Sequence, residues 1–282
     1  MDRPVINGHQ LVDNFANLVK LSGKVTGHTQ YAPEIRRTFM TDNGIHQGFM
    51  FPVDGRICYS AAAPAYAYDE FHYLDTTTWD LEIGNDAQAV VATLVAGSQT
   101  GEVILTSGNA GTGIAADGSV MALPLVLEAE EGKIVLYSRM KIASAADVWF
   151  FLGFTDTLPG VTLEQPFSLS GTTYTSTASN ACGFLFDTAA TTDTIRIVGV
   201  EGDTDATHLD TGLAPGTAYR DYKLVLSEDG SLDAYIDGVH YAQVLNAVAP
   251  GTDLCAFAGI NARTTTSKTM TLDALGYQQI PA

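Results

Sequence analysis

The stretch DVWFFLGFTD, residues 147–156, decides the fold. It is strongly apolar and ends on an acid, Asp156. Because successive side chains of a β-strand point to opposite faces, both faces of this strand are apolar: Trp149, Phe151 and Gly153 on one, and Val148, Phe150, Leu152 and Phe154 on the other. A sugar-binding strand would alternate aromatic with polar residues. The stretch therefore predicts a central strand covered on both faces, with Trp149 in the core.

Short apolar runs continue on both sides of this strand. From residue 71 onward they recur about every 8–12 residues between turn-forming residues, which is typical of an all-β sandwich or barrel. Examples are KIVLYSRMKIA (133–143), CGFLFDT (182–188) and YKLVLSEDG (222–230). Asp229-Gly230 and Asp237-Gly238 fit two-residue type I′ hairpin turns. The expected fold is a two-sheet antiparallel β-sandwich.

The first 60 residues have a different pattern. GHQLVDNFANLVKLSG (8–23) places Leu11, Phe15 and Leu18 at helical spacing and predicts a short amphipathic helix that needs a partner surface. Short strands or an extended arm are expected after it, and the segment 61–70 reads as a linker or an edge. We therefore predict an N-terminal arm over 1–62 and a β-sandwich over 63–282.

Charge divides the chain in the same place. Residues 1–60 hold six basic and five acidic side chains, whereas the remainder holds eight basic and 27 acidic ones, and the formal net charge of the whole chain is −18. Such a surface repels phosphate backbones and anionic membranes, so neither nucleic acid nor a membrane is expected as a partner.

The three cysteines are odd in number and far apart, which favours buried free thiols. Because the first residues lack the apolar run of a signal peptide, synthesis in a cytoplasm is expected.

Several segments, taken in order, carry a resemblance to a known family. They are FLGFTD (151–156), GFLFDT (183–188), the turn DTG (210–212), the hairpin with its DG and YIDG turns (229–238), and SKTMTLD (267–273). The set resembles the concanavalin A-like (laminin-G-like) jelly-roll domains of tailed-bacteriophage structural proteins, over about residues 70–280. The resemblance implies a jelly-roll sandwich. It leaves function open, because the same fold serves lectins, glycanases and virion proteins.

The search for a catalytic site finds an incomplete motif. Glycanases of this fold carry acids at alternate positions of one strand, in an E-x-D-x-E arrangement. Asp80-Leu81-Glu82 supplies two acids, and Gly84 stands where the third is needed. An outward-facing strand near a sheet edge is the favoured interpretation, so no catalytic residue is expected and the chain is predicted not to be an enzyme.

Two kinds of ligand stay open at this point. Asp203, Asp205 and Asp210 offer oxygen ligands for Ca²⁺, although the loop lacks the register of a dedicated calcium site, and no other cofactor is expected. The histidines are scattered, without the spacing of metal ligands. A surface glycan would need an exposed aromatic ring, and Tyr174 is one eligible ring. Four others are candidates for a glycan or contact surface: Tyr66, Tyr68, Tyr73 and Trp79.

The functional expectation combines these observations. It is a non-enzymatic virion protein that decorates the capsid, with the acidic sandwich outside and the arm bound to the major capsid protein or another virion protein. Its contact residues are expected to be Leu11, Phe15, Leu18, Arg36 and Arg37. A homo-oligomer is expected on symmetric capsid sites. The alternative is a glycan-binding module of a tail fibre or tailspike that recognises a host surface.

Overall fold

The computed structural model describes residues 36–41, 44–50, 57–59, 66–69, 71, 79–84, 90–95, 101–109, 117–123, 126–157 and 163–281. By its contacts the chain divides into two compact units, Met1–Pro64 and Ala65–Ala282. The helix predicted over 8–23, with Leu11, Phe15 and Leu18, lies outside the described residues.

The described part of the first unit is a small antiparallel sheet. Its strands are β1 (Arg36–Thr41), β2 (Gly44–Met50) and β3 (Ile57–Tyr59), with β2 in the middle. Arg36 and Arg37 begin β1, where they pair with Phe49 and Gly48. The sequence left short strands or an extended arm open for this region, and the structure has strands.

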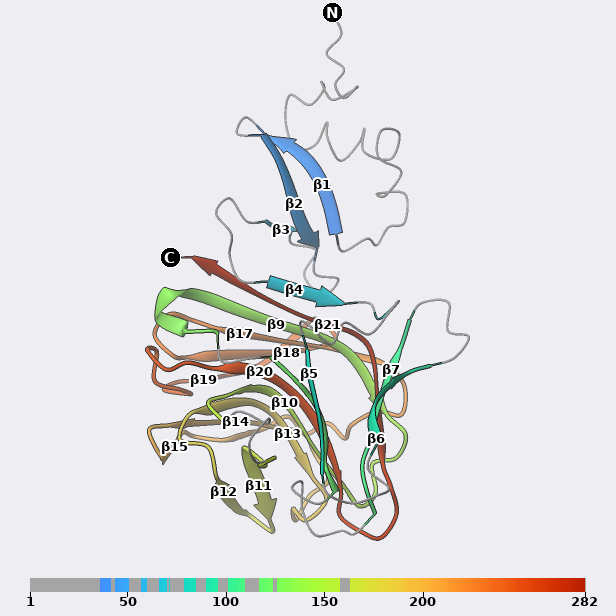
Figure 1. Ribbon diagram of the computed structural model, residues 1–282. Coiled ribbons are helices and arrows are strands. Elements are labelled where there is room, and N and C mark those ends of the chain that lie inside the picture. The colour runs from blue at the N-terminus through green and yellow to red at the C-terminus, as the bar shows by residue number, and fades with distance from the viewer. Residues whose placement is uncertain are drawn as a thin grey trace, which may run out of the picture. The chain divides into compact units, whose positions relative to one another are not determined.

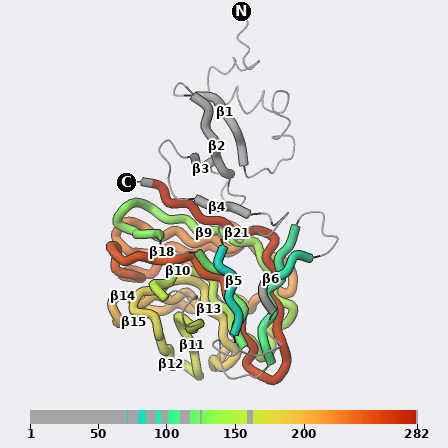
Figure 2. The backbone as a smooth tube through the Cα atoms, in the orientation of Figure 1, coloured from blue at the N-terminus to red at the C-terminus, as the bar shows by residue number. Residues whose placement is uncertain are grey.

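The second unit is a sandwich of two antiparallel sheets, which we name the β10 sheet and the β9 sheet after a central strand of each (Figures 1 and 2). The β10 sheet runs in the order β15 (Thr204–Asp205), β14 (Arg196–Glu201), β13 (Ala181–Asp187), β10 (Val148–Thr155), β20 (Cys255–Ala262), β8 (Ser119–Ala122), β5 (Asp80–Ile83), and β16 (Leu209–Asp210) also pairs with β14. The β9 sheet runs in the order β19 (Val239–Val244), β18 (Leu232–Ile236), β17 (Arg220–Leu226), β9 (Gly132–Ile142), β21 (Thr269–Pro281), β7 (Val103–Thr106), β6 (Val90–Leu94), and β4 (Tyr66–Asp69) also pairs with β21. A one-turn 3₁₀ segment, Ala129–Glu131, precedes β9. The predicted all-β sandwich is confirmed.

A third layer covers part of the β10 sheet. It is the hairpin of β11 (Phe167–Ser170) and β12 (Thr173–Ser176), which lies below β10 and β13 in Figure 1. The core consequently has two parts. The inter-sheet cluster, between the two large sheets, includes Phe150, Leu152 and Phe184, whereas the outer cluster, under the hairpin, includes Trp149, Phe151, Phe167, Leu169 and Phe257.

The strand that decided the fold occupies the position predicted for it. All eight residues of β10 are buried, and it pairs with β13 on one side and β20 on the other. Each face of β10 contributes side chains to one cluster. Phe150 and Leu152 pack between the two sheets, whereas Trp149 and Phe151 pack under the hairpin. Trp149 is therefore a packing residue, as the alternation indicated.

Of the two predicted hairpin turns, one is confirmed. Asp237 and Gly238 both have positive φ (51° and 78°), as a type I′ turn requires. The Asp229-Gly230 turn differs from the prediction. There Ser227 and Ser231 still pair, Gly230 N–H donates to the Ser227 carbonyl, and only Gly230 has positive φ (78°). This is a three-residue loop with glycine in the left-handed position.

Gly230 also lies close to a neighbouring loop, which leads to a first prediction. A Cβ at this position would meet the Val248 carbonyl oxygen at 2.1 Å, and φ is +78°. We expect Gly230→Ala to lower the free energy of unfolding by about 2–4 kcal/mol, from left-handed backbone strain plus overlap. Gly202→Ala is the control, because φ is +52° there but nothing lies within 4 Å, so only the backbone cost of about 1–2 kcal/mol applies. Equal losses in urea unfolding of the two variants would contradict the steric part.

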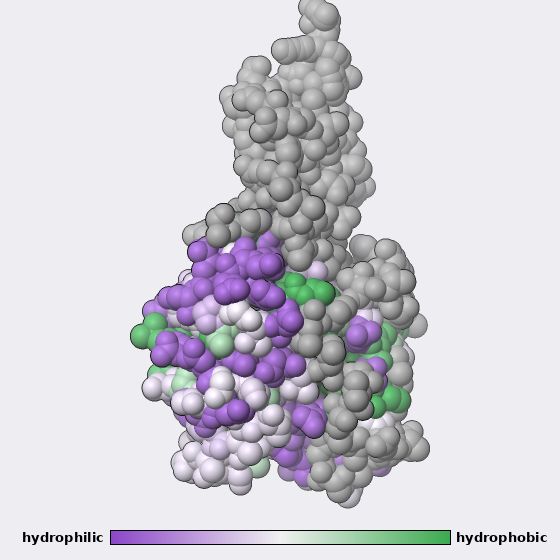
Figure 3. Space-filling model, turned by 60° about the vertical axis from the view of Figure 1, so that its left-hand side comes forward, coloured by the Kyte–Doolittle hydropathy of each residue, from purple (hydrophilic) through white to green (hydrophobic). Residues whose placement is uncertain are grey.

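The surface of the sandwich is largely polar, and its two described cysteines are buried. The described part of the face in Figure 3 is mostly hydrophilic or neutral, with small hydrophobic patches. Cys182 and Cys255 are free and buried, as expected, and burial raises the pKa of both thiols, that of Cys255 to about 12. Over the described residues, no helix has the length and apolar character needed to cross a membrane.

Candidate functional site

The outer face of the β10 sheet, turned away from the β9 sheet, brings the chemically interesting side chains together. Strand register shows which residues share this face, because directly paired residues project to the same side. One row runs from Glu82 through Val120 and Gly259 to Phe151. The neighbouring row begins at Asp80 and runs through Ala122, Phe257 and Gly153.

Asp80 and Glu82 therefore stand on the same face of β5, at the edge of the outer cluster. Asp80 is exposed and Glu82 half-buried, while their paired residues Val120 and Ala122 are buried. β5 ends the strand order of the sheet, as the sequence interpretation of an edge strand anticipated. Two carboxylates thus lie two residues apart next to an apolar floor, and Gly84 supplies no third acid.

The floor of this face is aromatic and tightly packed. Phe151 contacts both Phe167 and Phe257, with 5.8 Å between ring centroids in each pair. Gly153 leaves no space for a side chain, since a Cβ there would meet the Cys182 carbonyl oxygen at 2.2 Å. A Cβ at Gly153 would also lie 2.9 Å from Cζ of Phe151, so the glycine leaves room for this ring.

One buried carboxylate fixes the hairpin over this floor. Asp187 accepts hydrogen bonds from the backbone N–H of Leu169 and of Ala189 (3.0 Å each) and from the guanidinium of Arg263 (Nε at 2.9 Å). Trp149 adds a second anchor, because its Nε1–H donates to the Phe167 carbonyl at 2.8 Å. The hairpin is therefore attached by polar bonds at both β10 and β13.

A second polar cluster lies beside the hairpin, near β14 and β16. The ring of His208 lies 4.0 Å from that of Tyr174 and 5.9 Å from that of Phe167, and its Nε2 is 3.0 Å from the Gly199 carbonyl oxygen. Arg196 Nη1 pairs with Asp210 Oδ2 at 2.9 Å. The sequence singled out Tyr174 only as an eligible ring and did not predict the cluster, because only the β12 and β16 pairings bring Tyr174, His208 and Arg196 together.

The environment of His208 predicts a pH dependence of stability. Burial lowers the pKa of His208 below 6.5, although the Gly199 carbonyl and the charge of Asp205 oppose the shift. The folded protein thus prefers the neutral imidazole, so its stability is highest above the unfolded-state pKa and falls as pH drops below it. We expect the loss of stability between pH 6.5 and about 5 to be smaller in His208→Gln than in the parent chain, measured by urea unfolding at each pH. Parallel pH profiles would contradict this assignment.

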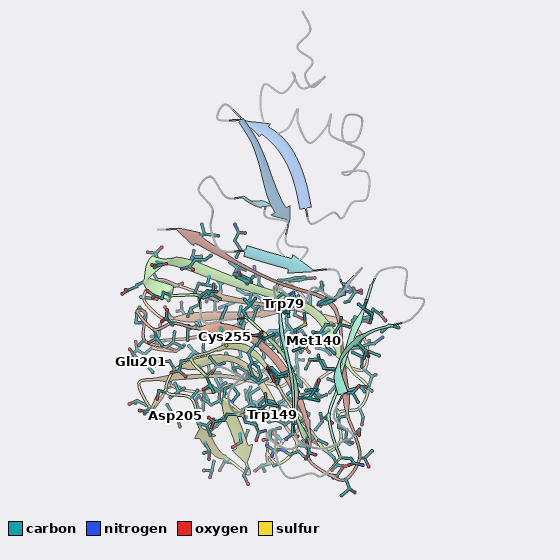
Figure 4. The ribbon with its side chains drawn as sticks, viewed as in Figure 1. Trp79, Met140, Trp149, Glu201, Asp205 and Cys255 are labelled. Atoms are coloured by element: carbon teal, nitrogen blue, oxygen red, sulfur yellow. The ribbon has the colours of Figure 1, made fainter. Side chains whose placement is uncertain are left out.

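The structure places the other predicted residues as follows. Trp79 is 1% exposed and belongs to the inter-sheet cluster, so it offers no surface ring. Tyr66 and Tyr68 lie in β4, opposite Gln278 and Gly276, and Tyr73 is outside the described residues. Trp149, in β10, lies away from Glu201 at the end of β14 and from Asp205 in the edge strand β15 (Figure 4).

The acids considered for calcium do not converge. Asp203 accepts from the Ser179 hydroxyl at 2.7 Å, Asp205 is exposed, and Asp210 is engaged by Arg196. Within the described ranges no group of three His, Cys, Asp or Glu side chains could hold a metal ion.

No family model and no curated protein matches the chain. Solved structures do. The β-glucanase of Bacillus licheniformis has a TM-score of 0.51 at 12% identity and covers 78% of this chain and 100% of its own. A family 16 endo-glucanase from Bacteroides ovatus has a TM-score of 0.51 at 12% identity, with 74% and 98% covered. The endo-β-1,4-glucuronan lyase of the fungus Trichoderma reesei has a TM-score of 0.52 at 11% identity, with 76% and 95% covered. These likenesses establish the concanavalin A-like jelly-roll fold.

The comparisons correct the functional expectation. The sequence led to a non-enzymatic virion protein on a capsid, with a receptor-recognition module as the alternative, and that expectation was wrong. The three solved structures named above are two glucanases and a glucuronan lyase, and they give no support to a phage origin. The error arose because an incomplete acid motif was taken as evidence against an enzyme.

Proposed function

We propose that the chain is a carbohydrate-active enzyme that cleaves a polysaccharide, with Asp80 and Glu82 as its pair of catalytic carboxyl groups. The observation that carries the proposal is the placement of both acids on the outer face of β5. The fold shared with glucanases and a lyase supports the substrate class.

The spacing of the pair suits glycosidic chemistry. Two residues apart on one strand face means about 6.8 Å between Cα atoms. Carboxyl groups that flank a scissile glycosidic bond are about 5–9.5 Å apart. One acid protonates the leaving oxygen as the C–O bond breaks, and the other carboxylate attacks the anomeric carbon or activates water. Exposure of Asp80 at the edge strand leaves it accessible to a polymer.

The charge of the chain favours a neutral substrate. The residues after the first 60 hold 27 acidic and eight basic side chains, and the net charge of the chain is −18. An anionic polysaccharide such as glucuronan is repelled by this field, whereas a neutral glucan is not. We therefore propose a neutral β-glucan as the substrate.

The test is an assay of reducing-end release by the full chain on mixed-linkage β-glucan and on glucuronan. We expect cleavage of the glucan, and a fall in rate of at least about 10²-fold in Asp80→Asn and in Glu82→Gln. Asp205→Asn, an exposed acid on β15 at the opposite edge of the sheet, is the matched control and should keep the parent rate.

Thermal unfolding of each variant separates lost chemistry from lost folding. Both acids lie on an edge strand, so their amide variants should unfold at the parent temperature. Absence of release from both polysaccharides, or variants of Asp80 and Glu82 as active as the parent chain, would end the proposal.

A further inference from the structure

An aromatic and polar surface lies at the end of the β10 sheet opposite β5. Arg196 in β14 pairs directly with Asp210 in β16, and it also pairs with Leu185 of the outer cluster, so these side chains project from the outer face. Tyr174, in β12 of the hairpin, packs against the same cluster, and its ring contacts that of His208. We name the four side chains Tyr174, Arg196, His208 and Asp210 the Tyr174 surface.

This surface is open to solvent in the folded chain. The Asp210 side chain is 39% exposed and that of Arg196 is 17% exposed. Tyr174 and His208 are half-buried, and the adjoining Thr192 is exposed. A ligand can therefore reach these groups without any opening of the sandwich.

The groups of the Tyr174 surface are held in place by contacts within the fold. The His208 ring lies 4.0 Å from the Tyr174 ring, and its Nε2 is 3.0 Å from the Gly199 carbonyl oxygen. Because a carbonyl only accepts, Nε2 carries the proton and Nδ1 is left as an acceptor. Arg196 binds Asp210 at 2.9 Å and donates to the Thr192 hydroxyl. Binding groups that are fixed beforehand lose little freedom when a ligand arrives.

The charges of this surface favour a neutral ligand. Arg196 is already paired with Asp210, and burial lowers the pKa of the His208 imidazole below 6.5, so that ring is neutral at pH 7. Asp205, which is close enough to act on His208, adds negative charge and repels anions. What remains is an aromatic ring beside fixed donors and acceptors. A sugar matches this combination, since it has apolar C–H faces and hydroxyl groups that both donate and accept.

We propose that the Tyr174 surface is a second saccharide-binding site, which holds a neutral glucan with one sugar face on the Tyr174 ring and its hydroxyl groups on Arg196 and Asp210. The site is separate from the Asp80–Glu82 pair, because β14 and β5 are five strand spacings apart, about 24 Å across the sheet. This inference rests on the substrate class of the proposed function, but it requires no catalytic step.

The test follows the His208 imidazole by NMR while a mixed-linkage β-glucan tetrasaccharide is titrated into the Glu82→Gln chain, in which cleavage is suppressed. The His208 signals are the ones that disappear in His208→Gln. We expect them to shift saturably, because the ring contacts Tyr174. The dissociation constant read from this shift should rise at least ~10-fold in Tyr174→Ala, which removes the stacking ring.

Two further variants keep the test decisive if Tyr174→Ala disturbs the hairpin. Asp210→Ala removes an exposed carboxylate at little cost in stability and should raise the dissociation constant about threefold or more. Thr175→Ala is the matched control: Thr175 is an exposed neighbour of Tyr174 on the opposite face of β12, so this variant should bind as the parent chain does.

Weaker binding in Asp210→Ala with unchanged binding in Thr175→Ala supports the inference. Parent His208 signals that do not shift with the tetrasaccharide overturn it, as does parent-like affinity in Asp210→Ala. The proposed function is judged separately by reducing-end release. Cleavage of the glucan without a shift at His208 removes the second site alone, whereas a shift without cleavage removes the proposed function alone.

Discussion

Trp149→Ala should lower the free energy of unfolding by about 3–5 kcal/mol, the range for deleting a large aromatic from a core. The ring is 0% exposed and packs in the outer cluster, and its Nε1–H donates to the Phe167 carbonyl at 2.8 Å. The substitution therefore opens a cavity under the hairpin and leaves that carbonyl without its donor. Urea unfolding followed by circular dichroism measures the loss.

A second variant separates packing from the hydrogen bond. Trp149→Phe keeps an aromatic ring in the outer cluster but cannot donate to Phe167, so a loss of about 1–2 kcal/mol is expected. Unchanged stability of Trp149→Ala is the result that would exclude a core role for the strand.

Asp187→Ala is expected to be similarly damaging, by about 3–5 kcal/mol, because it removes one member of a buried ion pair. The variant leaves the Arg263 guanidinium and the N–H groups of Leu169 and Ala189 without their acceptor. The partial exposure of Arg263 lets water replace some of that contact, which favours the lower end of the range.

The matched control for Asp187 is a carboxylate–imidazole contact near the surface. Asp233 lies 2.8 Å from His240 Nε2, and the His240 side chain is 47% exposed. Asp233→Ala should cost less than about 1 kcal/mol by the same unfolding measurement. Comparable losses in the two alanine variants would contradict the buried network around Asp187.

Local sequence was sufficient to predict burial and turn geometry where these depend on residues of the same strand or hairpin. The buried position of β10 followed from its two apolar faces, and the Asp237-Gly238 turn followed from residues adjacent in the chain. The loop at Gly230 could not be predicted in the same way. Its geometry depends on the segment around Val248, which closes against the glycine from outside the hairpin.

The candidate site was predicted only in part, for a related reason. The Asp80–Glu82 pair was visible because period-two spacing is local. Asp187 and Arg263, 76 residues apart, meet only through the pairing of β13, β10 and β20.

The position of β21 has a consequence for biosynthesis. This strand, Thr269–Pro281, lies inside the β9 sheet and pairs with β9, β7 and β4, which all precede it in sequence (Figure 1). The sheet therefore cannot close while those earlier strands leave the ribosome. Until β21 is translated, their edges stay open to pairing with other chains. Folding of the β9 sheet therefore depends on non-local contacts that can form only after β21 has been made, and such contacts form slowly.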